Sequence, residues 1–206
     1  MNIAAALLVV DAQYGFMPGG GLAVADGDSI VPVINQMAPL FANVVLTQDW
    51  HPANHVSFAA NHPGRQPFET IALPYGEQVL WPTHCVQGTR DAALHDDLRV
   101  PQAQLIIRKG FHSEVDSYSA FVEADRKTST GLAAYLHARG ITSLYLCGLA
   151  TDYCVSWSAQ DARAAGFEAI VIEDACRAID MNGSLEKAWA SLAAAGVGRI
   201  HSSQLA

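Results

Sequence analysis

Residues 143–155 read SLYLCGLATDYCV, and this stretch combines the two kinds of element that recur along the whole chain. The segment 143–146 is short and mostly apolar, as expected of a strand that is covered on both faces. Helical periodicity begins near Thr151 and stops at Gly166, a residue type that often follows the last turn of a helix. A buried strand that leads directly into a helix is typical of a parallel sheet.

The alternation of strand and helix extends outward from this stretch in both directions. Strands are expected at 3–10, 43–48, 104–108, 143–146 and 168–172, with a sixth at 197–201, and helices at 28–41, 130–139, 151–165 and around 185–192. Apolar strands that are separated by helices pair in parallel. The sequence therefore predicts an α/β fold, a doubly wound and mostly parallel sheet of about six strands with helices on both faces.

Length and composition indicate one folded unit. The chain has 206 residues, of which 50% are hydrophobic and 16% charged, and this composition excludes intrinsic disorder. We therefore expect residues 1–206 to form a single domain. Residues from about 49 to 101 are rich in Pro, His, Asn and Gly and show little periodicity. A long irregular stretch in a compact domain usually has a function, so we interpret it as an insertion that builds a metal site.

The net charge indicates which classes of partner are disfavoured, and the cysteine content indicates in which cellular compartment the protein is expected. Twelve basic and twenty acidic side chains give a net charge of −8, which disfavours binding to nucleic acid or to an anionic membrane. The apolar run at 3–10 is too short to span a bilayer and lacks the basic flank of a signal peptide. The four cysteines contain no C-x-x-C pair, so disulfide bonds are not expected. We expect a cytoplasmic protein.

Polar side chains stand where four of the expected strands end. Asp11 follows the first strand, Asp49 and His51 follow the second, Lys109 follows the third and Cys154 lies shortly after the fourth. The carboxyl ends of parallel strands meet at one edge of a sheet, where ligands bind in open α/β folds. We therefore expect two acids, a histidine, a lysine and a thiol to share this edge.

Cys154 is the candidate nucleophile at this edge. It lies in the first turn of an expected helix, where unpaired N–H groups and the helix dipole lower the pKa of a thiol. The small residues Gly148 and Ala150 allow a sharp turn that brings backbone N–H groups to a reacting carbonyl group. Asp11 is the candidate base, and His112 is the alternative. The other three cysteines fit inert positions in the core.

A metal site is expected beside the thiol. Asp49 and His51 are two residues apart, so their side chains point to the same side of an extended segment, and His84 can complete the set. One carboxylate and two imidazoles leave positions for water, as in catalytic rather than structural metal sites. His55 is a further candidate ligand. This donor set suits one divalent ion per chain, which is zinc, iron or manganese.

Six segments together resemble the bacterial nicotinamidases, also called pyrazinamidases, which belong to the isochorismatase-like hydrolases. The segments are VVDAQYGF at 9–16, TQDWHPANH at 47–55, WPTHCVQG at 81–88, RKG at 108–110, DSYSAF at 116–121 and GLATDYCV at 148–155. The resemblance runs in the same order and spacing from about residue 7 to about residue 200.

This resemblance implies an amidohydrolase that converts nicotinamide to nicotinate and ammonia through a cysteine thioester, a step of NAD salvage, and that also deamidates pyrazinamide. It implies a catalytic triad, which falls on Cys154, Asp11 and Lys109. It further implies a cis peptide bond before Ala150 and an oxyanion hole formed by the N–H groups of Ala150 and Cys154.

The resemblance also implies a metal and a substrate pocket. Metal ligation falls on Asp49, His51 and His84, and a fourth ligand from His55 or a nearby serine is left open. Three aromatic residues take the positions that stack on the substrate ring, with packing in the core as the alternative. These residues are Phe16, Trp81 and Tyr118. Nicotinamide is the expected partner, and the sequence leaves a homodimer open.

Two other classes of function are alternatives. Another hydrolase of the same fold, such as an isochorismatase or a carbamoyl amidohydrolase, is the nearest, but the isochorismatase reaction has no obvious need for Cys154. A metal-stabilised binding module has no need for Asp11, Lys109 and Cys154 at one edge. Release of ammonia from nicotinamide discriminates among the three.

Overall fold

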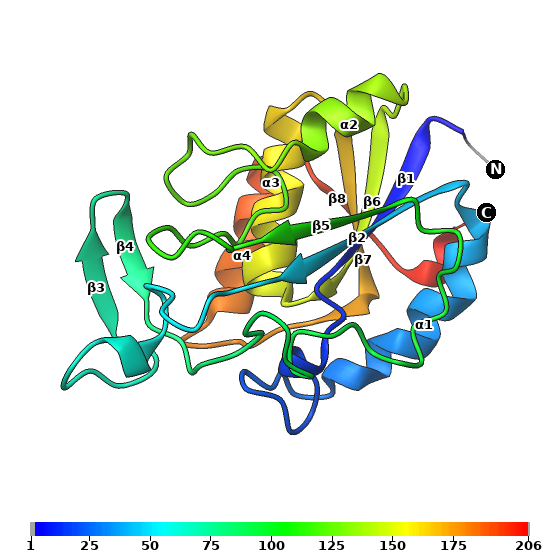
Figure 1. Ribbon diagram of the computed structural model, residues 1–206. Coiled ribbons are helices and arrows are strands. Elements are labelled where there is room, and N and C mark those ends of the chain that lie inside the picture. Colours follow the sequence, from blue (N-terminus) through cyan, green and yellow to red (C-terminus); the bar gives the residue numbers. More distant parts are fainter. Residues whose placement is uncertain (1–2, 206) are drawn as a thin grey trace.

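The computed structural model describes residues 3–205 and contains a six-stranded sheet and a separate two-stranded sheet (Figure 1). The strands of the large sheet are β1 (Ala5–Val10), β2 (Asn43–Asp49), β5 (Leu105–Lys109), β6 (Ser143–Leu149), β7 (Glu168–Arg177) and β8 (Gly198–Ile200). They lie in the order β5-β2-β1-β6-β7-β8, and every neighbouring pair is parallel. The predicted doubly wound parallel sheet is confirmed.

Strands β1 and β6 form the centre of the sheet. Every residue of β1, AALLVV, is buried, so the strand is covered on both faces. The chain runs from β1 to β2 on one side and from β6 to β7 on the other. Because such crossovers are right-handed, the two connecting helices cover opposite faces. The order therefore switches between β1 and β6, which is the place where open α/β sheets bind their ligands.

The helices pack on both faces, as predicted. Helix α1 (Ile30–Met37) lies on one face, whereas α2 (Leu132–Ala138), α3 (Ser156–Ala164) and α4 (Ser184–Ala194) lie on the other (Figure 1). Helix α1 buries Ile30, Ile34 and Met37, which are spaced as one helical face requires. It is shorter than the predicted helix at 28–41, because 3-10 turns at 27–29 and 38–40 flank it.

The segment after β6 differs most from its prediction. Strand β6 continues to Leu149, three residues beyond its expected end. The helix expected at 151–165 begins with a π-helical turn, Thr151–Val155, a form that is frequent at functional sites. Gly148 has a φ of +121°, and a Cβ atom there would lie 1.9 Å from the carbonyl oxygen of Val10. Only glycine allows β6 to approach β1 so closely at this point.

The segment between β2 and β5 is mostly irregular, as predicted, but it holds a hairpin that the sequence did not indicate. Strands β3 (Thr70–Leu73) and β4 (Gly76–Val79) pair antiparallel. The side chains of β3 are exposed or half-buried, so no buried apolar face marks the strand in the sequence. A parallel bridge between His51 and Val86 brings the start of the segment next to its later part.

Two further expectations concern membranes and disulfides. Within residues 3–205, no helix is long and apolar enough to cross a membrane. All four cysteines are buried and free in the structure.

Candidate active site

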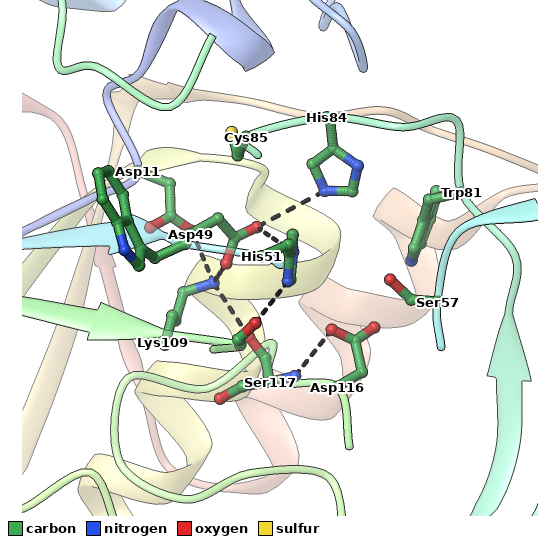
Figure 2. Close-up of polar contacts among 12 residues, drawn as sticks. Asp11, Asp49, His51, Ser57, Trp81, His84, Cys85, Lys109, Asp116 and Ser117 are labelled. Carbon is green, nitrogen blue, oxygen red and sulfur yellow. Dashed lines mark hydrogen bonds and ion pairs between the residues drawn. The ribbon is translucent and has the colours of Figure 1, made fainter. Parts of the chain in front are cut away.

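Lys109 connects the side chains that gather at the strand ends (Figure 2). It is the last residue of β5, and its side chain is fully buried. Its Nζ atom lies 2.9 Å from Asp11 Oδ2 and 3.3 Å from Cys154 Sγ. Nζ also donates hydrogen bonds to Asp49 Oδ1 and, at 3.0 Å, to the carbonyl oxygen of Ser117. One buried cation thus contacts two carboxylates and the thiol.

Asp11 is the first residue after β1 and is fully buried, with a φ of 47°. Its N–H donates to Thr47 Oγ1 at 3.0 Å, and the Thr47 hydroxyl donates back to Asp11 Oδ1 at 2.5 Å. The other oxygen, Oδ2, faces Lys109 and accepts no hydrogen bond of good geometry from the described residues. A carboxylate oxygen of Asp11 lies within 4.8 Å of Cys154 Sγ. The carboxylate is therefore both fixed in orientation and close to the thiol.

Burial and the shared lysine set the protonation of these groups. Burial raises the pKa of Asp11, although Lys109 opposes the shift. Burial disfavours the charged form of Lys109, but the two carboxylates outweigh it and raise the pKa of the amine well above its usual value. Burial also raises the pKa of Cys154 well above its usual value, against the opposing effect of Lys109. The expectation of a lowered thiol pKa is therefore wrong, and the thiol needs a base.

The turn after β6 places Cys154. The peptide bond Leu149–Ala150 is cis, as the resemblance implied. The carbonyl oxygen of Ala150 accepts hydrogen bonds from the N–H groups of Tyr153 at 3.2 Å and Val155 at 3.1 Å. These contacts close the turn and direct the Cys154 thiol, whose residue is 5% exposed, towards Lys109. An oxyanion hole at the N–H groups of Ala150 and Cys154 stays a prediction.

The three expected metal ligands come together beside Lys109 (Figure 2). Asp49 Oδ2 lies 3.5 Å from His51 Nε2 and 3.7 Å from His84 Nε2. Each imidazole is held through its other nitrogen, because Nδ1 of His51 lies 2.8 Å from the carbonyl oxygen of Gly110 and Nδ1 of His84 lies 2.8 Å from that of Pro82. A proton on each Nδ1 leaves both Nε2 lone pairs facing Asp49, as in metal-binding histidines. The donor set fits one divalent ion.

Asp49 stays ionised although it is buried. Burial alone would raise its pKa, but Lys109 and His51 outweigh burial and hold the pKa well below the usual value. Gln13 fixes the backbone of Asp49, because its side chain donates to the Asp49 carbonyl oxygen at 2.8 Å and accepts the Asp49 N–H at 2.8 Å. The sequence did not reveal Gln13, since a glutamine after a strand end has no distinctive pattern.

His55, the candidate fourth ligand, directs both ring nitrogens to other partners. Its Nδ1 lies 2.7 Å from Ser57 Oγ, and its Nε2 lies 3.3 Å from the carbonyl oxygen of Val115. Burial lowers the pKa of His55 to about 4, so the ring is neutral. A second group of potential ligand atoms, from His51, His55 and Asp116, lies within 4.8 Å. Asp116 is buried and was not foreseen from the sequence.

A small cavity, partly open to solvent, adjoins both the thiol and the metal ligands. All three predicted aromatic residues line it, and Trp81 Nε1 donates a hydrogen bond to Tyr118 Oη at 3.0 Å. The aromatic residues are Phe16, Trp81 and Tyr118, and the sequence missed Leu22, Tyr153 and Ile179. The cavity is apolar on these sides and suits a small aromatic ring that carries a polar group towards Cys154.

His112, the alternative base, does not join the site. Its Nδ1 lies 2.8 Å from Glu123 Oε1, and its side chain is 50% exposed. A carboxylate oxygen of Asp11, by contrast, lies within 4.8 Å of Cys154 Sγ. Asp11 is therefore the acid that the structure brings to the thiol.

Known proteins match this chain over nearly its whole length. Residues 5–204 match the family model of the isochorismatase domain. The chain is 65% identical to the nicotinamidase of Acinetobacter baylyi, over 96% of this chain and 92% of that protein. A solved Acinetobacter baumanii nicotinamidase and pyrazinamidase has a TM-score of 0.99 at 64% identity, with 100% of both chains covered. A pyrazinamidase of Pyrococcus horikoshii in complex with zinc has a TM-score of 0.79 at 34% identity, covering 96% of this chain and 99% of that one.

Proposed function

This chain belongs to the isochorismatase family, and from that premise we propose that it is a nicotinamidase. It hydrolyses the linear amide bond of nicotinamide to give nicotinate and ammonia, and it also deamidates pyrazinamide. One observation carries the proposal: Lys109 Nζ contacts both Asp11 and Cys154, and Cys154 lines an aromatic cavity. The names of the two Acinetobacter relatives, both nicotinamidases, support nicotinamide as the substrate.

The first step is transfer of the thiol proton to Asp11. The Cys154 thiol is neutral at rest because burial raises its pKa, so attack requires a base. Burial raises the pKa of Asp11 as well, which makes this carboxylate a stronger base than an exposed aspartate. Lys109 stays charged and stabilises the thiolate as it forms. The thiolate then attacks the amide carbon.

The second step expels ammonia. The negative charge that develops on the amide oxygen is stabilised by the N–H groups of Ala150 and Cys154, the proposed oxyanion hole. Asp11, now protonated, returns its proton to the departing nitrogen, and the C–N bond breaks. The product is a thioester between Cys154 and the nicotinoyl group.

The third step releases nicotinate. A water molecule takes the place that ammonia leaves, and Asp11 removes one of its protons. The resulting hydroxide attacks the thioester carbonyl, the C–S bond breaks, and Cys154 regains a proton from Asp11. The same carboxylate therefore acts twice as a base and twice as an acid.

Asp49, His51 and His84 would hold the metal. Both Nε2 atoms and Asp49 Oδ2 face one another, and the remaining positions are free for water or substrate. When bound, a divalent ion orients and polarises the pyridine ring through its nitrogen. Zinc is supported by the zinc-bound Pyrococcus pyrazinamidase, and iron and manganese are the alternatives for the same donors. We further propose a cytoplasmic enzyme, since all four cysteines are unpaired.

Ammonia release from nicotinamide by the purified protein tests the function. Cys154→Ala should abolish turnover, whereas Cys147→Ala, a matched change of a buried cysteine in β6, should retain it. Mass spectrometry of the wild-type protein mixed rapidly with nicotinamide should find the nicotinoyl group on Cys154. A wild-type protein that releases no ammonia, or a Cys154→Ala protein that keeps a tenth of the activity, rules the proposal out.

A further inference from the structure

Three of the residues that line the catalytic cavity are partly exposed, and we call their side chains its mouth. Tyr118, Tyr153 and Ile179 are half-buried, whereas every other residue that lines the cavity is buried. These three side chains are therefore the part of the lining that solvent reaches. Tyr118 is fixed by the hydrogen bond from Trp81 Nε1, and Tyr153 belongs to the π-helical turn. Ile179 is held by neither of these features.

Ile179 lies in a segment that has neither helical nor strand structure. Residues 178–183 connect the end of β7 to the start of α4. Asp180 and Asn182 have positive φ angles, 52° and 54°, and Gly183 follows with 73°. No ladder or helical hydrogen bond within the segment can hold Ile179 at the mouth, so its position depends on contacts with other elements.

Asp152 supplies those contacts. It is buried and lies two residues before Cys154 in the π-helical turn. Its Oδ1 accepts the N–H of Ile179 at 3.1 Å, and its Oδ2 accepts the N–H of Asp180 at 2.8 Å and the hydroxyl of Ser184 at 2.5 Å. Hydrogen bonds to a carboxylate are stronger than those between neutral groups. The turn that carries the nucleophile therefore also fixes the mouth.

We propose that Asp152 is a positioning residue that holds Ile179 at the mouth of the cavity and thereby determines how tightly, and with which ring substituents, a pyridine carboxamide binds. Asp152 does not line the cavity itself, so it acts through Ile179. The proposal rests on the nicotinamidase function. It assigns Asp152 to substrate binding and not to the bond-breaking steps, which belong to Asp11, Lys109 and Cys154.

Steady-state kinetics of Asp152→Ala, Ile179→Ala and the double variant test this assignment. Loss of apolar contact at the mouth should raise KM for nicotinamide about tenfold in each single variant, with kcat changed less than about twofold. The double variant should be no worse than either single one, because both act through the same side chain. Asp152→Asn, which keeps one acceptor oxygen, should give an intermediate KM.

A panel of ring-methylated nicotinamides gives a second readout. If the mouth widens, kcat/KM for at least one methylated isomer should rise relative to nicotinamide, with the same isomer favoured in Asp152→Ala and Ile179→Ala. A change that only weakens the fold would lower kcat/KM for all isomers alike.

Asp174→Ala is the matched control. Asp174 in β7 also accepts an N–H and a hydroxyl, both from Ser202, at 2.7 and 2.5 Å, but it does not line the cavity. KM and the isomer preference should stay at wild-type values. Should Asp152→Ala not fold, Ser184→Ala removes one of the three bonds and should raise KM in the same direction by a smaller factor.

The outcomes separate this inference from the function itself. No ammonia from the wild-type protein overturns the nicotinamidase function and this inference with it. If the wild-type protein is active, a fall in kcat at unchanged KM in Asp152→Ala overturns the inference alone. Additive effects in the double variant also overturn the inference alone. An unchanged KM in both Ile179→Ala and Ser184→Ala does the same.

Discussion

Two carboxylates at the ends of neighbouring strands differ in what surrounds them. Asp11 follows β1 and Asp49 ends β2, and both contact Lys109 Nζ. Burial raises the pKa of Asp11, whereas the pKa of Asp49 stays well below its usual value despite burial. The neighbours contribute to this difference, because Asp49 faces two imidazoles that lower its pKa, whereas Asp11 lies near the charge of Asp49.

Asp11 and Asp49 are the same residue type in one site, yet their surroundings suit them to different tasks. A carboxylate that stays ionised is a suitable metal ligand, and one with a raised pKa is a suitable proton carrier. Lys109 lowers the pKa of both carboxylates, and among the described residues it donates a hydrogen bond of good geometry to Asp49 but not to Asp11. His51 and His84 lower the pKa of Asp49 further, whereas the charge of Asp49 itself adds to burial in raising the pKa of Asp11.

Asp11→Asn should have the largest effect on this division of tasks. The amide keeps the size of the side chain but cannot accept the thiol proton, so kcat should fall by about 10³-fold or more. Single-turnover measurements of ammonia release are the check. An Asp11→Asn protein with activity close to wild type would require a different base.

Lys109→Met should come next, because it removes the shared partner. Two buried carboxylates would be left without their cation, which should cost about 3–5 kcal/mol of unfolding free energy in addition to activity. Urea unfolding of the folded protein measures this cost. Lys127→Met, a change of an exposed lysine, should leave both quantities unchanged. Equal stability of the two variants would mean that the buried ion pairs contribute nothing.

Removal of the metal should affect the task of Asp49, which is to hold the ion that binds the substrate ring, and not the task of Asp11. A chelator should weaken nicotinamide binding and activity reversibly, and His84→Ala should do the same without a chelator. Benzamide, which has the ring and the amide but no ring nitrogen, should bind far more weakly than nicotinamide to the metal-loaded protein and about equally to the stripped one. Isothermal titration measures both ligands. Tight binding of nicotinamide to stripped protein would show that the metal does not hold the ring.

Thr47→Val should have the smallest effect, and it tests the role of Asp11 as the base. The Thr47 hydroxyl lowers the pKa of Asp11, so its loss raises that pKa further. Because only ionised Asp11 accepts the thiol proton, the acid limb of the kcat/KM profile should move to higher pH. Loss of one buried hydrogen bond should also cost about 1–2 kcal/mol of stability. An acid limb at its wild-type position would contradict the base role of Asp11.

The sequence predicted the sheet and the residues at its edge for one physical reason. Parallel strands that are buried on both faces are apolar throughout, so the polar residue that ends each one stands out. Asp11, Asp49 and Lys109 were found in this way, and the structure places their side chains in contact. Cys154 needed the helix that follows its strand as well.

The parts that the sequence missed depend on neighbours that are distant along the chain. Thr47 looks like an ordinary β-branched strand residue, and only the pairing of β2 with β1 places it against Asp11. Asp152 looks like a residue at a helix start, and its partners lie 27 to 32 residues further on. The lowered pKa expected for Cys154 was wrong because local position indicated the helix terminus but not the burial.

The metal content of Asp11→Asn and Asp49→Asn tests the division of tasks most directly. Both variants change one carboxylate beside the same lysine to an amide of equal size, and both can be assayed for metal after purification in the presence of a divalent ion. We expect Asp11→Asn to retain one metal ion per chain while losing turnover, and Asp49→Asn to lose the metal. Loss of metal from Asp11→Asn, or full metal content in Asp49→Asn, would contradict the account.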